Sequence, residues 1–235
     1  MSQAQRRTEI AANLETVRGR IAAACAGAGR SADEVTLVVV TKFFPAADVR
    51  ILADLGVRTV GENRFQEASA KAAECADLGL SWHFIGGIQS NKAAAIARFA
   101  DVVESVDRPK LVDALDRGAA DAGRTVDCLL QVSLDPADAV GRSGATPDEL
   151  GALAAAVAGA RALRLRGLMA VAPLGAPPRS AFEELAEIAR SFRADHPDAD
   201  VLSAGMSGDL EDAIACGATH VRVGSAVLGP RPVIK

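Results

Sequence analysis

Short runs of apolar and β-branched residues alternate along the chain with segments of helical periodicity. In the helical segments apolar residues recur every three or four positions, as in Phe182, Leu185 and Ile188. A long amphipathic segment over residues 3–28 predicts a helix before the first apolar run. The apolar runs, each predicted to be a strand, lie at 36–41, 57–60, 82–86, 102–106, 128–134, 165–170, 200–204 and 220–224.

The repeated order of strand and helix predicts parallel βαβ units. Eight candidate strands fit a closed (β/α)8 barrel better than an open doubly wound sheet, which has fewer strands. No internal repeat, charge block or low-complexity linker divides the sequence. We therefore predict an α/β protein with a single (β/α)8 TIM barrel domain over residues 1–235, in which residues 1–30 form a helix packed on the barrel.

Composition excludes several classes of function. The chain is 49% hydrophobic and 24% charged, with a net charge of −4, so it lacks a general attraction to nucleic acid or anionic lipid. No apolar run approaches the about 18 residues of a membrane span. The four cysteines and three histidines show no metal-ligand spacing. We expect a cytoplasmic protein with reduced thiols that binds no metal, no nucleic acid and no membrane.

Lysine 42 directly follows the first predicted strand. In a parallel barrel the C-terminal ends of all strands meet at one rim, where function concentrates. Partial desolvation of Lys42 at this rim would lower its pKa and expose the neutral amine that imine formation with an aldehyde needs. The alternative from position alone is a lysine whose amine simply reaches water.

Two segments near the C-terminus predict an anion site. Ser207 and Gly208 follow the seventh strand, and Ser207 is a candidate helix N-cap with an open backbone behind it. The alternative is an ordinary capped helix, because the acidic residues Asp209, Glu211 and Asp212 would repel a phosphate.

The eighth strand supplies the second segment. Alternation with the neighbouring valines directs Arg222 into the barrel, where a guanidinium needs a partner. Gly224 permits close backbone approach, and Ser225 adds a hydroxyl. Phosphate sites of such barrels are commonly built from the loops after strands seven and eight. Together with Lys42, this pattern favours an aldehyde phosphate as ligand, either pyridoxal 5′-phosphate (PLP) or a sugar phosphate.

Two further polar residues follow or lie in early strands. Asn63 follows the second strand and is suited to hold the hydroxyl of a pyridoxal ring, although a turn residue is the simpler interpretation. His83 alternates with Trp82 and Phe84, so we expect it to face the barrel interior as a hydrogen-bonded core histidine.

The order and spacing of several segments resemble the pyridoxal phosphate homeostasis protein family, a single-domain relative of the alanine racemase N-terminal barrel. The resemblance extends from about residue 35 to 231, and it is specific as a set rather than in any one piece. Its segments are Val40-Thr41-Lys42, Gly61-Glu62-Asn63, Trp82-His83-Phe84-Ile85-Gly86, Gln89-Ser90-Asn91-Lys92, Ser105-Val106-Asp107, Gly167-Leu168-Met169, Leu202-Ser203, Gly205-Met206-Ser207 and Val221-Arg222-Val223-Gly224.

The resemblance implies a cytoplasmic protein that holds PLP and takes part in vitamin B6 homeostasis without defined catalytic turnover. It therefore implies no catalytic residue, and PLP-dependent client enzymes are the expected partners. The cofactor-binding residues that it implies are Lys42 as the aldimine lysine, Asn63 beside the ring, Arg222 facing the pyridine nitrogen, and Ser207, Gly208, Gly224 and Ser225 on the phosphate.

The sequence departs from the family pattern at five positions. Gly87, Ala204, Ser133, Arg142 and Ser225 stand where a larger residue, methionine, asparagine, lysine and threonine, respectively, are common. Arg142 lies in a loop at 135–148 that we interpret as a flap. We therefore expect ligand exchange to differ from that of other family members.

An arginine facing the pyridine nitrogen argues for binding over catalysis. Arginine can only donate, which leaves the nitrogen unprotonated and the ring a weaker electron sink. Racemisation also needs a second base, and the chain contains no tyrosine. The alternatives are a weak amino-acid racemase, a lysine-dependent aldolase acting on a sugar phosphate, and a purely structural protein. Because the second racemase domain is missing, we expect a monomer.

Overall fold

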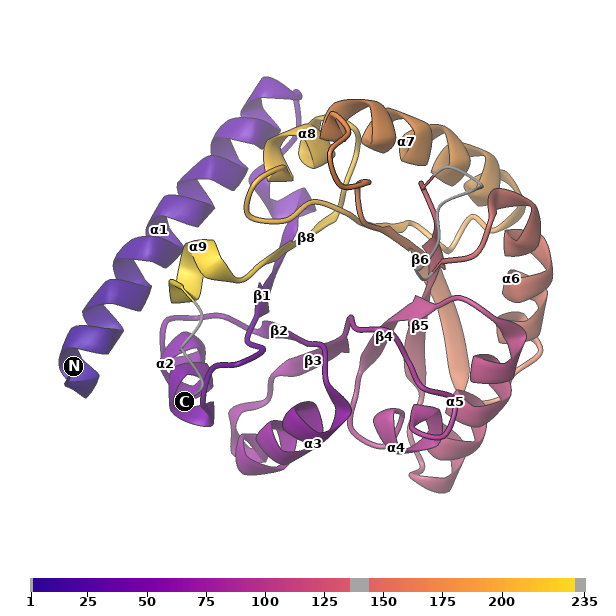
Figure 1. Ribbon diagram of the computed structural model, residues 1–235, viewed down its shortest axis with the longest axis horizontal. Coiled ribbons are helices and arrows are strands. Elements are labelled where there is room, and N and C mark those ends of the chain that lie inside the picture. Colours follow the sequence, from indigo (N-terminus) through magenta and orange to yellow (C-terminus); the bar gives the residue numbers. More distant parts are fainter. Residues whose placement is uncertain (1, 136–143, 231–235) are drawn as a thin grey trace.

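The computed structural model describes residues 2–135 and 144–230 and shows a closed barrel of eight parallel strands (Figure 1). Neighbours in the barrel are neighbours in the chain, and β8 pairs with β1 to close the ring. The predicted (β/α)8 fold is confirmed. The strands are β1 Thr36–Val40, β2 Thr59–Glu62, β3 Ser81–Phe84, β4 Val102–Val106, β5 Val126–Val132, β6 Leu163–Ala170, β7 Val201–Ser203 and β8 His220–Val223.

Helices surround the barrel as an outer ring (Figure 1). Their apolar faces pack on the outward-facing side chains of the strands, which buries a continuous layer between the two rings. The helices that follow the strands are α2 Ala46–Asp54, α3 Phe65–Glu74, α4 Ala93–Ile96, α5 Pro109–Asp121, α6 Leu150–Ala158, α7 Pro178–Asp195, α8 Leu210–Ala215 and α9 Ser225–Leu228, with short 3-10 turns at Ala32–Glu34, Ala76–Leu78 and Pro147–Glu149.

Helix α1 (Gln3–Gly27) precedes β1 and packs outside the barrel against α8 and α9 (Figure 1). Ser2 and Gln5 form a capping box at its start, which satisfies two backbone N–H groups. One face of α1 is buried, through Ile10, Leu14, Val17, Ile21 and Cys25. None of the helices in the described part of the chain is long and apolar enough to cross a membrane.

Strand register brings polar residues to the barrel interior. Arg222 on β8 is level with Val38 on β1, and His83 on β3 is level with Gly61 on β2. A side chain at Gly61 would start 3.1 Å from the Val38 side chain, so a glycine here leaves the interior room for its larger neighbours. His83 faces inward as the alternation predicts.

Candidate functional site

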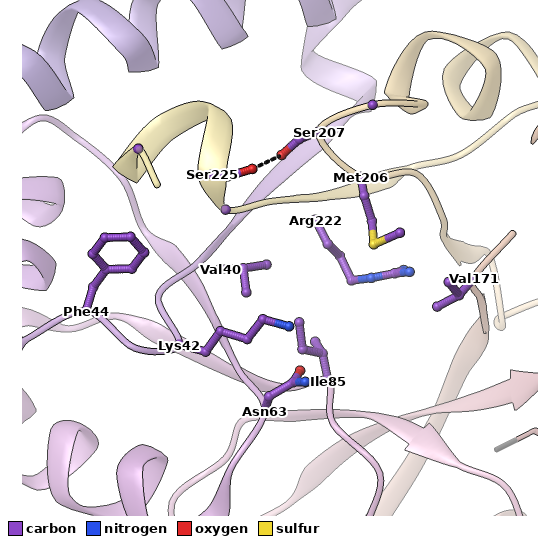
Figure 2. Close-up of a pocket in the computed structure, with 13 residues that line it drawn as sticks. Val40, Lys42, Phe44, Asn63, Ile85, Val171, Met206, Ser207, Arg222 and Ser225 are labelled. Carbon is purple, nitrogen blue, oxygen red and sulfur yellow. Dashed lines mark hydrogen bonds between the residues drawn. The ribbon is translucent and has the colours of Figure 1, made fainter. Parts of the chain in front are cut away.

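A cavity of about 360 Å³ opens at the rim where the strands end (Figure 2). The structure brings all seven predicted binding residues into its lining. The side at β1 and β2 carries Lys42 and Asn63, and the side at β7 and β8 carries the two serines, with Arg222 between them. The lining residues are Val40, Lys42, Phe44, Asn63, Ile85, Val171, Met206, Ser207, Gly208, Arg222, Gly224, Ser225 and Gly229.

Lys42 is half-buried on a turn that is fixed on both sides. The carbonyl of Thr41 accepts a hydrogen bond from Lys71 Nζ at 2.8 Å, and the N–H of Phe43 donates to Glu67 Oε1 at 2.5 Å. Among the described residues Phe43 is the only non-glycine with positive φ, at 72°. This conformation is strained for a bulky residue and persists only where neighbours enforce it. The turn therefore fixes the direction in which Lys42 leaves the backbone.

The partners of this turn form a buried ionic cluster between the barrel wall and α3. Lys71 Nζ donates to Glu62 Oε1 at 2.5 Å and to Glu67 Oε1 at 2.9 Å, and the Thr41 hydroxyl donates to Glu62 at 2.6 Å. Burial raises the pKa of Glu62, and the charge and hydrogen bond of Lys71 only partly offset it. Lys71 supplies the charge that makes this buried carboxyl tolerable.

The predicted phosphate side is a cradle that combines a loop at Ser207 and Gly208 with the start of the short helix α9 at Gly224 and Ser225. We predicted Ser207 as the N-cap of the next helix, and this is wrong: α8 begins at Leu210 with Asp209 as N-cap. Asp209 Oδ1 accepts from the Met206 N–H at 2.5 Å, which closes a turn across the serine and delays the helix. The Ser207 and Ser225 hydroxyls lie 3.5 Å apart and point toward each other at the wall of the cavity (Figure 2).

Glycines keep this cradle open. A Cβ built on Gly208 would find no atom within 4 Å, so the backbone there borders empty space. A Cβ on Gly224 would lie 3.2 Å from the carbonyl oxygen of Val40, tighter than ordinary contact, so glycine lets the end of β8 approach β1.

The acidic residues beside the cradle have their own partners. Arg20 on α1 binds both carboxylate oxygens of Glu211, at 2.7 and 2.9 Å, and donates to the carbonyl of Ser207 at 3.0 Å. The hydrogen bond from Arg20 lowers the pKa of Glu211. Asp212 lies 3.9 Å from Arg179. The repulsion of an anion that these acids would cause is therefore partly neutralised.

Arg222 is 4% exposed and is held from inside the barrel. Its Nη1 donates to Ser203 Oγ and its Nη2 to the carbonyl of Ala170, both at 2.8 Å. Burial lowers the pKa of Arg222, whereas the carboxylate of Glu104 raises it. The ordinary pKa of a guanidinium lies so far above neutral pH that Arg222 stays charged. The partner that an inward arginine requires is thus present.

Asn63 sits on the opposite wall, where two loops touch. A Cβ on Gly86 would lie 2.2 Å from the carbonyl oxygen of Asn63, so only glycine permits this contact. A neighbouring hollow of about 260 Å³ shares Asn63 and is lined by Gly87 and Ser133, two of the positions that depart from the family pattern. Most of the loop predicted as a flap, including Arg142, lies outside the described residues.

The apolar part of the lining was not predicted from the sequence. Val40, Phe44, Ile85, Val171 and Met206 line the cavity, and Met206 is 41% exposed. Such side chains resemble core residues in sequence, so only their position just after a strand end gives a signal. The cavity combines these apolar walls with one amine, one guanidinium and a pair of hydroxyls, which is the composition of a site for a small anionic ring compound.

Comparison with known proteins supports this description. A family model, the N-terminal domain of alanine racemase, matches residues 8–232. The pyridoxal phosphate homeostasis protein of Mycobacterium leprae (strain TN) is 45% identical over 244 residues, covering 97% of this chain and 95% of that protein. The pyridoxal phosphate homeostasis protein of Escherichia coli (strain K12) is 39% identical, covering 97% and 99%. The chain belongs to the pyridoxal phosphate homeostasis protein family.

Two solved structures have the same fold as this chain. PipY of Synechococcus elongatus PCC7942, whose structure was determined with PLP bound, is 36% identical with a TM-score of 0.81 and covers 94% of this chain and 100% of its own. Alanine racemase from Corynebacterium glutamicum is 18% identical with a TM-score of 0.67, covers 94% of this chain and 62% of its own, and shares the fold.

Proposed function

We propose that this protein binds PLP in the rim cavity, attached through Lys42, and serves intracellular PLP homeostasis. The observation that carries the proposal is the meeting of the Lys42 amine, Arg222 and the Ser207–Ser225 cradle in one cavity. The names of its relatives and the PLP-bound PipY structure support the same ligand.

The residues present suit each part of PLP. The empty space over Gly208 is room that a Cβ would fill, and it adjoins two hydroxyls able to donate to a phosphate. Among the described lining residues the only side chains that titrate are those of Lys42 and Arg222, so the cavity presents cations and no carboxylate to an anion. Apolar walls formed by Val40, Ile85 and Val171 suit the faces of an aromatic ring.

PLP supplies an aldehyde that condenses with a primary amine and a ring that withdraws electrons. The contribution of the protein is to hold Lys42 half-buried on a fixed turn, where a less hydrated amine is a better nucleophile. Arg222 offers only N–H donors, so it favours an unprotonated ring nitrogen. Ser207, Gly208, Gly224 and Ser225 would hold the phosphate, and Asn63 would orient the ring.

The same lining argues for little or no turnover. Racemisation at Cα needs an acid–base group on each face of the bound substrate, and among the described lining residues only Lys42 can exchange a proton with a substrate, because a guanidinium keeps its protons. With no tyrosine in the sequence, this chain cannot supply a phenol as the second group. We propose that racemase activity is slow or absent.

The cellular setting is part of the proposal. The four cysteines are free thiols, which suits a reducing cytoplasm. We propose that the protein acts there as a monomer and passes PLP to PLP-dependent enzymes. Light scattering of the purified protein tests the first statement, and the rate at which an apo-enzyme gains activity from the loaded protein, compared with free PLP, tests the second.

An absorption spectrum of the purified protein after incubation with PLP tests the central proposal. We expect a visible band, and borohydride reduction followed by peptide mass mapping should place the adduct on Lys42. Lys42→Ala should lose both signals. Lys92→Ala, which removes another lysine near the rim, should keep them. A colourless wild-type protein without a mass adduct would refute the proposal, and rapid deuterium exchange at Cα of alanine would favour the racemase alternative.

A further inference from the structure

Four polar side chains form a connected layer inside the barrel at the floor of the cavity. They are His83 on β3, Glu104 on β4, Ser203 on β7 and Arg222 on β8, with exposed fractions of 5%, 0%, 0% and 4%. Barrel interiors are normally filled by layers of branched apolar side chains. Burying charge costs desolvation free energy that hydrophobic packing would avoid. The position of this layer directly under the cavity points to a role in ligand binding.

Glu104 is the centre of the layer. Its Oε1 lies 2.6 Å from His83 Nδ1, and its Oε2 accepts from the Ser203 hydroxyl at 2.6 Å. Ser203 Oγ in turn accepts from Arg222 Nη1 at 2.8 Å, and this Nη1 lies 3.9 Å from Glu104 Oε2. Arg222 Nη2 donates to the carbonyl of Ala170 on β6. Ser203 thus links the two groups, because it donates to the Glu104 carboxylate and accepts from the Arg222 guanidinium.

The protonation states are consistent with a fixed arrangement. Burial raises the pKa of Glu104, but the hydrogen bond and charge of His83, the charge of Arg222 and the Ser203 hydroxyl lower it to about 2. A carboxylate only accepts hydrogen bonds, so His83 Nδ1 must carry a proton. His220 stacks on His83 with ring centroids 6.1 Å apart, and burial lowers its pKa to about 4, so it is neutral at pH 7.

We propose that Glu104, acting through Ser203, is a positioning residue that keeps Arg222 aimed at the ring nitrogen of the ligand. The inference rests on the proposed function, because the nitrogen is that of PLP. A guanidinium bound only at the Ala170 carbonyl would be free to turn away from the cavity. With Glu104 and Ser203 in place, the site recognises the ring nitrogen as well as the aldehyde and the phosphate.

Paired ligands test this proposal. The dissociation constants of PLP and of its 1-deaza analogue, which has C–H in place of the ring nitrogen, are measured by absorbance titration. The wild type should bind PLP at least about tenfold more tightly than the 1-deaza analogue, because one hydrogen bond to a charged group contributes about that much affinity. Glu104→Gln and Ser203→Ala should each reduce this preference at least threefold. Asp101→Asn removes a carboxylate that precedes β4 and pairs with Arg124, and it should keep the preference.

Each outcome separates the two proposals. A wild type that binds neither ligand refutes the proposed function itself. A wild type that binds PLP and the analogue equally, or variants that keep the full preference, would overturn the role of Glu104 and leave PLP binding intact. If Glu104→Gln does not fold, Ser203→Ala decides, because it removes one hydroxyl and leaves the buried charges in place.

Discussion

Replacing Arg20 with methionine should weaken binding of the phosphate and of no other part of the ligand. Arg20 belongs to α1, outside the barrel, yet it holds the carbonyl of Ser207 and both carboxylate oxygens of Glu211. Methionine keeps the apolar stem that packs on the helix but cannot donate. The variant therefore releases the cradle loop and leaves Glu211 without its cation beside the site.

The magnitude follows from exposure. The side chains of Arg20 and Glu211 are 31% and 48% exposed, so their ion pair contributes about 0.2–1 kcal/mol. The bond to the Ser207 carbonyl adds about 1 kcal/mol. Because PLP binding has to order the cradle loop again once these contacts are lost, a total of about 1–2 kcal/mol corresponds to a rise of about 5–30-fold in the dissociation constant of PLP.

Titration with PLP and with pyridoxal, which has the same ring and aldehyde but no phosphate, measures the effect. PLP affinity should fall by the factor above while pyridoxal affinity stays within about twofold. Arg7→Met is the matched control, because Arg7 lies on the same helix and pairs with the exposed Asp54. Equal losses for both ligands would show that Arg20 stabilises the fold generally, and an unchanged PLP affinity would show that α1 does not support the cradle.

Four further predictions concern single groups. Gly208→Val should leave thermal stability unchanged, because its Cβ meets no atom, and should weaken PLP at least about tenfold in the same titration. Lys71→Met should cost about 3–5 kcal/mol in urea unfolding by leaving Glu62 buried without its cation. The pKa of His220 is lowered from 6.5 to about 4 in the folded protein, so the unfolded state binds more protons between these pH values. The free energy of unfolding should therefore fall from pH 6.5 towards pH 4. His220→Gln should flatten this decline, as measured by the urea midpoint at each pH. The carboxylate of Glu104, with pKa about 2 against 4.5, contributes stability above pH 4.5 that should be lost towards pH 2, and Glu104→Gln should remove this acid limb.

Strand topology explains why the site could be predicted from the sequence. In a closed parallel barrel every strand ends at the same rim, so Lys42 after the first strand and Arg222 in the last must converge once the fold is right. Exact strand boundaries were not needed for this. The second strand was expected at 57–60 and lies at Thr59–Glu62, a shift that still leaves Asn63 just beyond its end.

The residues that hold the site in place could not be predicted from the sequence pattern. Alternation along a strand predicts that Arg222 points inward but does not identify its partner. Ser203 and Glu104, which form a hydrogen bond beneath Arg222, are 99 positions apart in the sequence. Arg20 reaches Ser207 across 187 positions. The N-cap prediction failed for a local reason. The Asp209 carboxylate accepts from the Met206 N–H and closes a turn over Ser207, so α8 begins only after Asp209.

The supports of the three parts of the site come from three separate places in the fold. Helix α1 holds the cradle through Arg20, α3 holds the lysine turn through Lys71, and the barrel interior holds Arg222 through Glu104. Groups that share no partner make additive contributions. Groups that carry out a chemical step together are strongly non-additive, since losing one disables the rest. We therefore expect the PLP affinity to decline in separate, additive steps as these supports are removed, whereas a strongly non-additive decline would indicate groups that carry out a chemical step together.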